Sequence, residues 1–243
     1  MIITLFLTIY EWSLSVVISI LLFPIALILF ILTSLFDKRK IILHQFSCFW
    51  ATILIWLQPL WKVNWEGKEN FKKDETYVII SNHQSLIDIL VIYSLFKHFK
   101  WVAKNTLLQV PLIGWNMALN DHIVVKRSDT KSQLKMMKHA ERTLKSGSSV
   151  MIFPEGTRSL NGEVGRFKRG AFILSEKTES SVIPIALYNI DKTIKKNSFW
   201  VNKALDMKAK VFPPVYPKDF KNSKEMSAGV KEIIANQLEE WRK

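Results

Sequence analysis

The sequence predicts an α/β protein: a mixed, mostly parallel sheet flanked by helices, preceded by a membrane-embedded two-helix element. The first sixty residues are overwhelmingly apolar, whereas from Val63 onward short apolar runs alternate with longer amphipathic ones. A chain of 243 residues is long enough for one domain with a sizeable core plus a membrane element. We therefore expect a membrane-associated helical element over residues 1–62 and a globular domain that carries the functional site over residues 63–243.

Two apolar segments make up the N-terminal element. Residues 13–36 form about 24 uncharged positions, enough to cross a hydrocarbon core, and Pro24 is expected to kink a helix there. The second segment, residues 41–61, contains aromatic rings of the kind that favour the headgroup boundary: Phe46, Phe49, Trp50, Trp56 and Trp61. A cleaved signal peptide is disfavoured, since no basic residue precedes the first run and no small-residue cleavage site follows it.

Two membrane topologies compete for these segments. If both crossed the bilayer, Lys38, Arg39 and Lys40 would lie on the side opposite the basic globular domain, which the positive-inside rule disfavours when that domain is cytoplasmic. The conflict disappears if the pair dips into one leaflet, or if only the first segment spans. We favour a kinked, aromatic-rich pair embedded from the cytoplasmic side over a full hairpin.

Composition narrows the classes of function. Most of the net charge of +13 lies after residue 62, which favours a polyanionic partner. Beside so apolar an N-terminus an anionic bilayer is the first choice, and nucleic acid is excluded as a partner because no recognisable binding module accompanies the charge. The single cysteine, Cys48, excludes an internal disulfide and a four-cysteine zinc site. The sequence also lacks an HExxH run and a Gly-x-Ser-x-Gly elbow, so we expect neither a metal site nor a serine hydrolase.

Hydrophobic periodicity places the elements of the globular domain. The expected strands are Tyr77–Ser81, His122–Val125, Val150–Phe153, Val182–Leu187 and Lys208–Phe212. The expected helices are Ile87–Phe96, Thr130–Lys145, Gly170–Glu176 and Ser223–Trp241.

A strand–turn–helix segment carries the strongest candidate for chemistry, the pair His83 and Asp88. Ser85-x-x-Asp88 before an apolar run has the form of a capping box, with its N-cap at Ser85. His83 lies before the cap, where the chain is free to fold back, and Asp88 in the first turn points its side chain toward the helix N-terminus. The carboxylate could orient the imidazole and leave one ring nitrogen free as a base for a substrate hydroxyl. An arbitrary His-x4-Asp is most often a turn residue followed by a helix-terminus charge, so the pair needs support from elsewhere in the chain.

That support comes from basic residues that follow predicted strands. The loop after Val150–Phe153 contains Arg158, a planar donor suited to phosphate, and backbone amides free to face an anion. Arg127 and Lys104 are placed alike, and ligands collect at strand carboxyl ends in α/β sheets. Each is a surface charge by default, but several together predict a phosphate site. Of three further cations, Arg166 and Arg169 fit a solvated turn slightly better than a site, and Lys168 fits either equally.

These segments together resemble the glycerolipid acyltransferases of the 1-acyl-glycerol-3-phosphate acyltransferase type. The resemblance covers roughly residues 65–217 and rests on four blocks in the family's order: Asn82–Asp88, Asp121–Arg127, Phe153–Ser159 and Val182–Leu187. The first and third blocks are specific, and their occurrence about 70 residues apart strengthens both. Where the family usually has an acidic residue before the arginine of the second block, this chain has Lys126.

The resemblance implies a glycerolipid acyltransferase fold and transfer of a fatty acyl group from a thioester to the free hydroxyl of 1-acyl-sn-glycerol 3-phosphate (lysophosphatidic acid). The product would be phosphatidic acid, an intermediate of phospholipid biosynthesis. By the same resemblance His83 deprotonates the hydroxyl and Asp88 orients the imidazole. The residues implied to bind substrate are Lys104, Arg127, Glu155, Gly156, Thr157 and Arg158.

The resemblance also sets expectations for partners and location. The co-substrate is acyl-CoA or an acyl-acyl carrier protein, no cofactor is needed, and anionic membrane lipid is contacted at the cytoplasmic face of a bacterial inner membrane. One alternative is an acyltransferase for another lysophospholipid or a lyso-aminolipid. Another is a non-enzymatic basic membrane-docking protein that uses an apolar stripe of the C-terminal helix. The acyl donor, the chain-length preference and the oligomeric state stay open.

Overall fold

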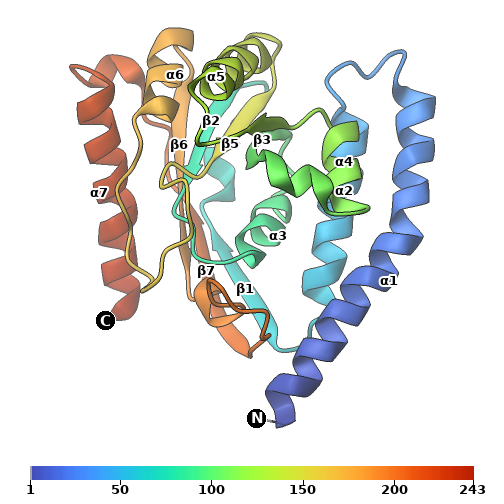
Figure 1. The fold of residues 1–243 in the computed structure, drawn as a ribbon. Helices are drawn as coiled ribbons and strands as arrows, with labels where there is room; N and C mark the ends of the chain where they lie inside the picture. Colours follow the sequence, from blue (N-terminus) through green and yellow to red (C-terminus); the bar gives the residue numbers. More distant parts are fainter. Residues whose placement is uncertain (1) are drawn as a thin grey trace.

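The computed structural model describes residues 2–243, which form a seven-stranded sheet between two layers of helices (Figure 1). The strands are β1 (Trp61–Glu66), β2 (Tyr77–Ser81), β3 (Phe99–Lys104), β4 (Ile123–Val125), β5 (Ser149–Ile152), β6 (Ser181–Tyr188) and β7 (Ala204–Val211). Their order in the sheet is β1-β7-β6-β2-β5-β3-β4, and every neighbouring pair is parallel except β6 and β7. The predicted α/β class with a mixed, mostly parallel sheet is confirmed.

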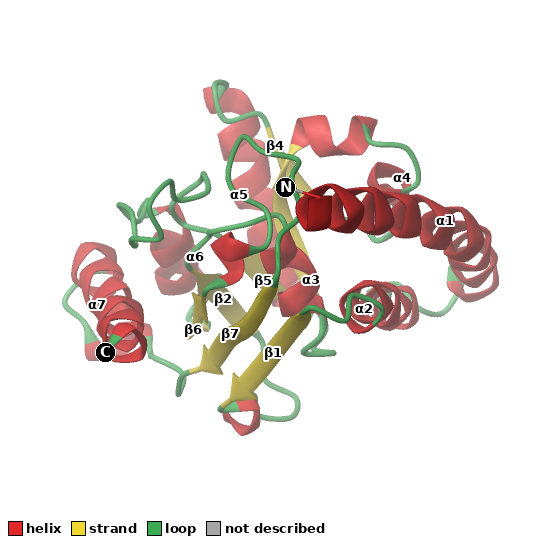
Figure 2. Ribbon diagram, turned by 90° about the horizontal axis from the view of Figure 1, so that it is seen from below, coloured by secondary structure: helices red, strands yellow, loops and turns green. Residues whose placement is uncertain are grey.

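Seven α-helices cover the described part of the sheet. They are α1 (Ile2–Thr33), α2 (Ile41–Trp56), α3 (Ile87–Tyr93), α4 (Ile113–Leu119), α5 (Thr130–Lys145), α6 (Gly170–Thr178) and α7 (Ser223–Arg242). Viewed from below, α1, α2 and α3 lie on one side of the strands and α5, α6 and α7 on the other (Figure 2). The structure adds β1, β3 and α4 to the elements expected from the sequence. It starts the first helix at Ile2 and not near residue 13, and it confirms the expected strands and the helices of the globular domain to within a few residues.

The central strand β2 is buried on both faces, as its uninterrupted apolar sequence requires. Its side chains alternate between two cores. Tyr77 and Ile79 belong to the core that α2 and α3 cover, whereas Val78 and Ile80 belong to the core that α5, α6 and α7 cover. Packing from both sides fixes the carboxyl end of β2, where the chain turns into the segment that contains His83.

Helices α1 and α2 are packed onto the globular domain. Leu7 of α1 and Cys48 and Ala51 of α2 belong to the same core as α3. The hydroxyl of Ser47 accepts hydrogen bonds from the side-chain amides of two α4-region residues, Asn116 and Asn120, at 3.0 and 3.1 Å. Residues 2–62 are therefore joined to residues 63–243 by a shared core, and the predicted division into two domains at residue 62 stays a prediction.

The outer face of α1 is exposed and apolar, and α1 is long and apolar enough to cross a bilayer by length and composition. The helix continues through Pro24 without interruption. Its exposed large side chains include Ile2, Ile3, Leu5, Phe6, Ile9, Trp12, Val16, Val17, Ile20, Leu21, Ile25, Leu27, Ile28, Ile31 and Leu32. A contiguous apolar face of this extent is typical of a surface that contacts lipid or another protein.

One expectation for the second apolar segment is wrong. Trp50 and Trp61 do not lie at a headgroup boundary, since only 3% and 5% of their surfaces are exposed, whereas Trp56 is 78% exposed. Trp61 begins β1, and its Nε1 donates a hydrogen bond of 2.9 Å to the carbonyl of Asn202. The alternation of Trp61, Val63 and Trp65 is the period of a strand with one buried face, but the apolar run before it conceals that signal.

Titratable side chains are buried between α2 and the sheet. The imidazole of His44 in α2 lies 5.2 Å from that of His98 and 6.1 Å from that of His122, measured between ring centroids. His122 Nε2 lies 2.9 Å from the hydroxyl of Tyr93. Burial lowers the pKa of His98 to about 4 and the pKa of His122 well below its usual value, and the nearby ammonium of Lys100 adds to both shifts.

We expect acid to destabilise the protein before its carboxylates titrate. A histidine with a lowered folded-state pKa binds fewer protons folded than unfolded, so stability is lost as pH falls from about 6.5 toward 4. Between pH 7.5 and 5.5, His98 alone should account for a loss on the order of 1 kcal/mol. Urea unfolding of detergent-solubilised protein at both pH values measures this, and His98→Asn should reduce the difference. An unchanged difference in that variant would contradict the assignment.

Candidate active site

The imidazole of His83 is hydrogen bonded to Asp88 at the start of α3. Nδ1 lies 2.7 Å from Oδ2 of Asp88, and the two side chains are 14% and 0% exposed. With Asp88 ionised, Nδ1 carries the proton and the lone pair of Nε2 is free. No hydrogen bond joins Nε2 to any residue between 2 and 243. This is the base-and-orienter geometry expected from the sequence.

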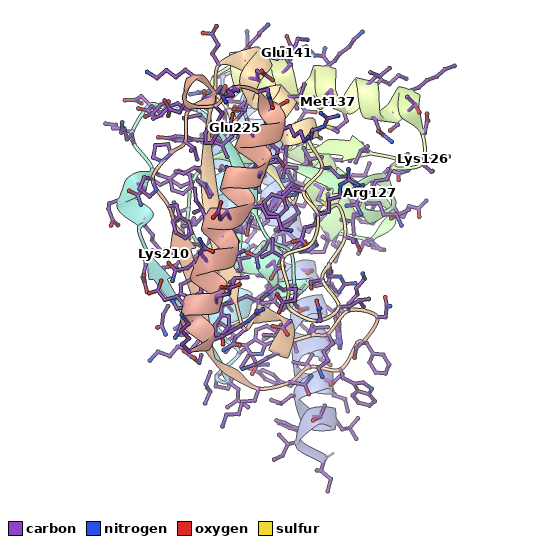
Figure 3. The ribbon with its side chains drawn as sticks, turned by 90° about the vertical axis from the view of Figure 1, so that its left-hand side faces the viewer. Lys126, Arg127, Met137, Glu141, Lys210 and Glu225 are labelled. Carbon is purple, nitrogen blue, oxygen red and sulfur yellow. The ribbon has the colours of Figure 1, made fainter. Side chains whose placement is uncertain are left out.

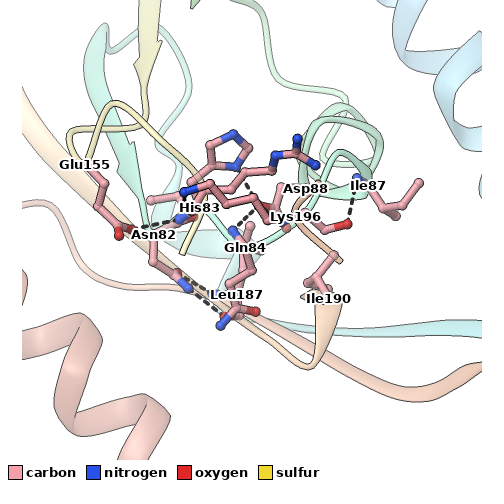
Figure 4. A network of polar contacts seen from close by, with 12 residues as sticks. Asn82, His83, Gln84, Ile87, Asp88, Glu155, Leu187, Ile190 and Lys196 are labelled. Atoms are coloured by element: carbon pink, nitrogen blue, oxygen red, sulfur yellow. Dashed lines mark hydrogen bonds and ion pairs between the residues drawn. The ribbon is translucent and has the colours of Figure 1, made fainter. Parts of the chain in front are cut away.

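The turn before α3 is organised by the same carboxylate oxygen. Oδ2 of Asp88 also accepts hydrogen bonds from the backbone N–H groups of Gln84 and Ser85, at 2.6 and 2.9 Å (Figure 4). The predicted N-cap at Ser85 is wrong, because the helix begins at Ile87 and has no side-chain cap. The Ser85 hydroxyl instead donates to the carbonyl of Ile194 at 2.9 Å, which ties the turn to the segment after β6.

An aromatic ring fixes the plane of the imidazole. The ring of Phe153 stacks on His83 with centroids 4.0 Å apart and planes 9° apart, and Trp101 lies behind it at 5.6 Å. The sequence gives no functional role to Phe153, which follows β5 directly. The only pattern that points to a role for Phe153 is weak: it is an aromatic residue just before Pro154, at the end of a strand that neighbours β2.

The loop after β5 holds the backbone of His83 on both sides. The His83 N–H donates to Oε1 of Glu155 at 2.9 Å, and the His83 carbonyl accepts from the N–H of Ser159 at 2.8 Å. On the other side, the Asn82 amide donates to the Leu187 carbonyl and accepts from its N–H, at 2.8 and 2.9 Å (Figure 4). The segment Asn82–His83 is therefore held between the loop that follows β5 and strand β6, and β5 and β6 are the two neighbours of β2.

Glu155 is a structural centre of this loop. Its second oxygen accepts the N–H of Gly165 at 2.9 Å, and the residue is only 8% exposed. Burial raises the pKa of this carboxyl, while the amides of His83 and Gly165 act in the opposite direction. Both oxygens are occupied by backbone groups, so substrate recognition by residue 155 stays a prediction.

The remaining residues of the turn, Gly156, Thr157 and Arg158, differ in conformation, exposure and hydrogen bonding. Nη1 of Arg158 is buried and has no hydrogen-bond partner among the described residues. The Arg158 carbonyl accepts a hydrogen bond of 2.7 Å from Nζ of Lys196, a residue to which the sequence gives no role (Figure 4). Gly156 has φ of +70°, a conformation that favours glycine, and Thr157 is exposed. A buried guanidinium nitrogen without a partner has a strong preference for an anion.

Lys104 and Arg127 lie at the same edge of the sheet but further from His83. Lys104 ends β3, two strands from β2, and Arg127 follows β4, three strands away. At about 4.8 Å between strands, these offsets are roughly 10 and 14 Å. Figure 3 shows Arg127 and Lys126 together, on the opposite side of α7 from Lys210. The assignment of both residues to substrate binding stays a prediction. Arg127 is the one whose strand lies farther from β2.

Comparisons with known proteins identify relatives of this chain. The acyltransferase family model matches residues 62–188. A chloroplastic 1-acyl-sn-glycerol-3-phosphate acyltransferase of Arabidopsis thaliana is 38% identical over 184 residues, which cover 75% of this chain and 51% of that protein. An enzyme of the same name from Chlamydomonas reinhardtii is 31% identical over 234 residues, covering 94% of this chain and 68% of that protein. The chain thus spans about half the length of the Arabidopsis relative and two thirds of the Chlamydomonas one.

A solved structure matches nearly the whole chain. The crystal structure of the 1-acyl-sn-glycerophosphate (LPA) acyltransferase PlsC from Thermotoga maritima superposes with a TM-score of 0.84 and 25% sequence identity. The match covers 99% of this chain and 97% of that one. It therefore includes the N-terminal helices as well as the sheet.

Replacing Glu155 by glutamine should destabilise the fold. A glutamine amide can accept one of the two backbone N–H groups but turns its own NH₂ toward the other, so one buried donor loses its partner. We expect a loss of about 1–3 kcal/mol in the free energy of unfolding, measured by denaturant titration. Glu176→Gln, which removes an exposed carboxylate on α6, is the matched control and should change little. Equal stability of the two variants would show that the clamp is unimportant.

Proposed function

The chain belongs to the acyltransferase family, and we propose that it transfers a fatty acyl group from an acyl thioester to the free hydroxyl of lysophosphatidic acid, forming phosphatidic acid. The observation that carries this proposal is the hydrogen bond of 2.7 Å between His83 Nδ1 and Asp88, which leaves Nε2 free as a base. Arg158, with a buried nitrogen that lacks a partner, supports a phosphorylated acceptor.

The proposed reaction needs no acyl-enzyme intermediate, because a thioester is already activated. Nε2 of His83 takes the proton from the acceptor hydroxyl as its oxygen attacks the thioester carbonyl. Asp88 stabilises the imidazolium that forms. Collapse of the tetrahedral intermediate breaks the carbon–sulfur bond, and the imidazolium returns the proton to the leaving thiolate. Phe153 and the loop after β5, which binds the backbone of His83, hold the ring in place during both steps.

We further propose that α1 and α2 embed the enzyme in one leaflet, at the cytoplasmic face of a bacterial inner membrane. A guanidinium nitrogen of Arg39, in the loop between α1 and α2, donates to the carbonyl of Gly147 in the globular domain at 2.9 Å. This contact supports a basic loop on the same side as the domain, whereas a full hairpin would put it on the opposite side. The contacts of Ser47 with Asn116 and Asn120 also support an α2 that rests on protein along one face.

Removal of either member of the proposed catalytic pair should abolish acyl transfer. We expect His83→Ala and Asp88→Asn to lower kcat by roughly 10²- to 10⁴-fold, since general-base catalysis supplies about that factor. Mass spectrometry of products from purified enzyme, lysophosphatidic acid and an acyl thioester measures it. Protein level and membrane association should persist in both variants, and His139→Ala on α5 is the matched control. Substantial activity in purified His83→Ala would refute the general-base role.

Arg158→Ala should weaken recognition of the acceptor more than that of the donor. We expect the KM for lysophosphatidic acid to rise roughly tenfold or more, because a charge-assisted hydrogen bond to phosphate is lost. Steady-state kinetics with each substrate varied in turn measures the two effects, with Lys195→Ala as a nearby exposed control. Equal effects on both substrates would remove the phosphate assignment, and a panel of lysophospholipids and lyso-aminolipids then identifies the preferred acceptor.

A further inference from the structure

A cationic pocket lies beside the loop that follows β5. It has a volume of about 480 Å³ and is lined by Glu155, Thr157, Gly165, Arg166, Phe167, Lys168 and Arg169. Neither His83 nor Arg158 lines it. We propose that this pocket binds the phosphate of the phosphopantetheine arm that carries the acyl group, the chemical unit that coenzyme A and acyl carrier proteins share. The inference rests on the proposed acyl transfer and assigns the carrier's end of the donor.

The charges of this pocket are not balanced within the protein. Arg166, Lys168 and Arg169 are exposed, and no salt bridge among residues 2–243 includes any of them. The one carboxylate in the lining, that of Glu155, is engaged by the N–H groups of His83 and Gly165. Three uncompensated cations within four positions favour a polyanionic ligand.

A backbone hydrogen bond holds the segment that carries the cations against the loop after β5. The N–H of Lys168 donates to the carbonyl of Pro154 at 2.9 Å, and Phe167 between the cations is only 6% exposed. A Cβ at Gly156 would lie 2.9 Å from Nζ of Lys168, so glycine leaves the space in which the ammonium rests on the turn. Helix α6 begins at Gly170, and its first N–H groups add to the positive potential. The pocket is therefore a defined part of the loop that clamps His83.

The position of the pocket fits the donor better than the acceptor. In lysophosphatidic acid the phosphate is attached next to the carbon that bears the reacting hydroxyl, so it must lie close to the imidazole of His83. Arg158, whose Nη1 is buried and lacks a partner, fits that nearer phosphate. In the donor, the long pantetheine arm separates the thioester from its phosphate. A second anion site, lined by neither His83 nor Arg158, is what such a substrate requires.

The test compares donors with and without the phosphate. Purified wild type and an Arg166→Gln/Arg169→Gln variant are assayed with acyl-CoA, acyl-acyl carrier protein and acyl-pantetheine, which lacks phosphate. We expect the ratio of kcat/KM for each phosphorylated donor to kcat/KM for acyl-pantetheine to fall roughly ten- to hundred-fold. The KM for lysophosphatidic acid should not change. Lys221→Gln/Lys224→Gln, an equal loss of charge at the start of α7, should keep the wild-type ratio.

The outcomes separate this inference from the function on which it rests. An unchanged ratio, or an equal loss with all three donors, would overturn the assignment of the pocket. A fall for acyl-CoA alone would mean that the pocket binds nucleotide phosphates, and would also overturn the assignment to the shared arm. Absence of acyl transfer by the wild type with every donor would instead refute the proposed function.

Discussion

One carboxylate oxygen organises the candidate active site. Oδ2 of Asp88 accepts hydrogen bonds from the imidazole of His83 and from two successive backbone amides of the turn before α3. The same atom therefore sets the tautomer of the ring and the conformation of the turn that presents it. Because Asp88 is fully buried, loss of this oxygen would leave three donors without a partner, and ring orientation and turn geometry would be disturbed together.

Strand order explains why the other parts of the site meet at this carboxylate. β2 lies between β5 and β6 in a largely parallel sheet, so the loops after all three strands emerge at one edge. The loop after β5 supplies Glu155 and Ser159 to the backbone of His83, and β6 receives the amide of Asn82. The candidate catalytic pair is local in sequence, but its surroundings are fixed by chain segments 72 to 105 residues away.

These two ranges of interaction decide what could be predicted from the sequence. The contact between His83 and Asp88 depends on one turn and the start of one helix, so residue spacing makes it a candidate and the motifs elsewhere in the chain support it. Three other contacts depend on which strands are neighbours in the sheet: the stacking of Phe153 on His83, the hydrogen bond from the His83 N–H to Glu155, and the contact of Lys196 with the loop after β5. Residue spacing does not contain that information. Trp61 was misplaced for a related reason: an apolar residue at a boundary has the same composition whether it faces lipid or pairs in a sheet.

Both substrates of the proposed reaction carry an anionic group and an apolar chain. The protein correspondingly has one apolar face and one cationic face. The outer face of α1 is apolar on one side of the sheet, whereas the cations at the start of α6 lie on the other (Figure 2). A lipid acceptor can then approach from the bilayer while the water-soluble carrier remains on the basic side. Glu155 lies between His83 and the cationic pocket. One of its oxygens accepts the N–H of His83, and the other accepts the N–H of Gly165. Each oxygen therefore accepts a backbone N–H, and the carboxylate forms no ion pair with the cations near the start of α6.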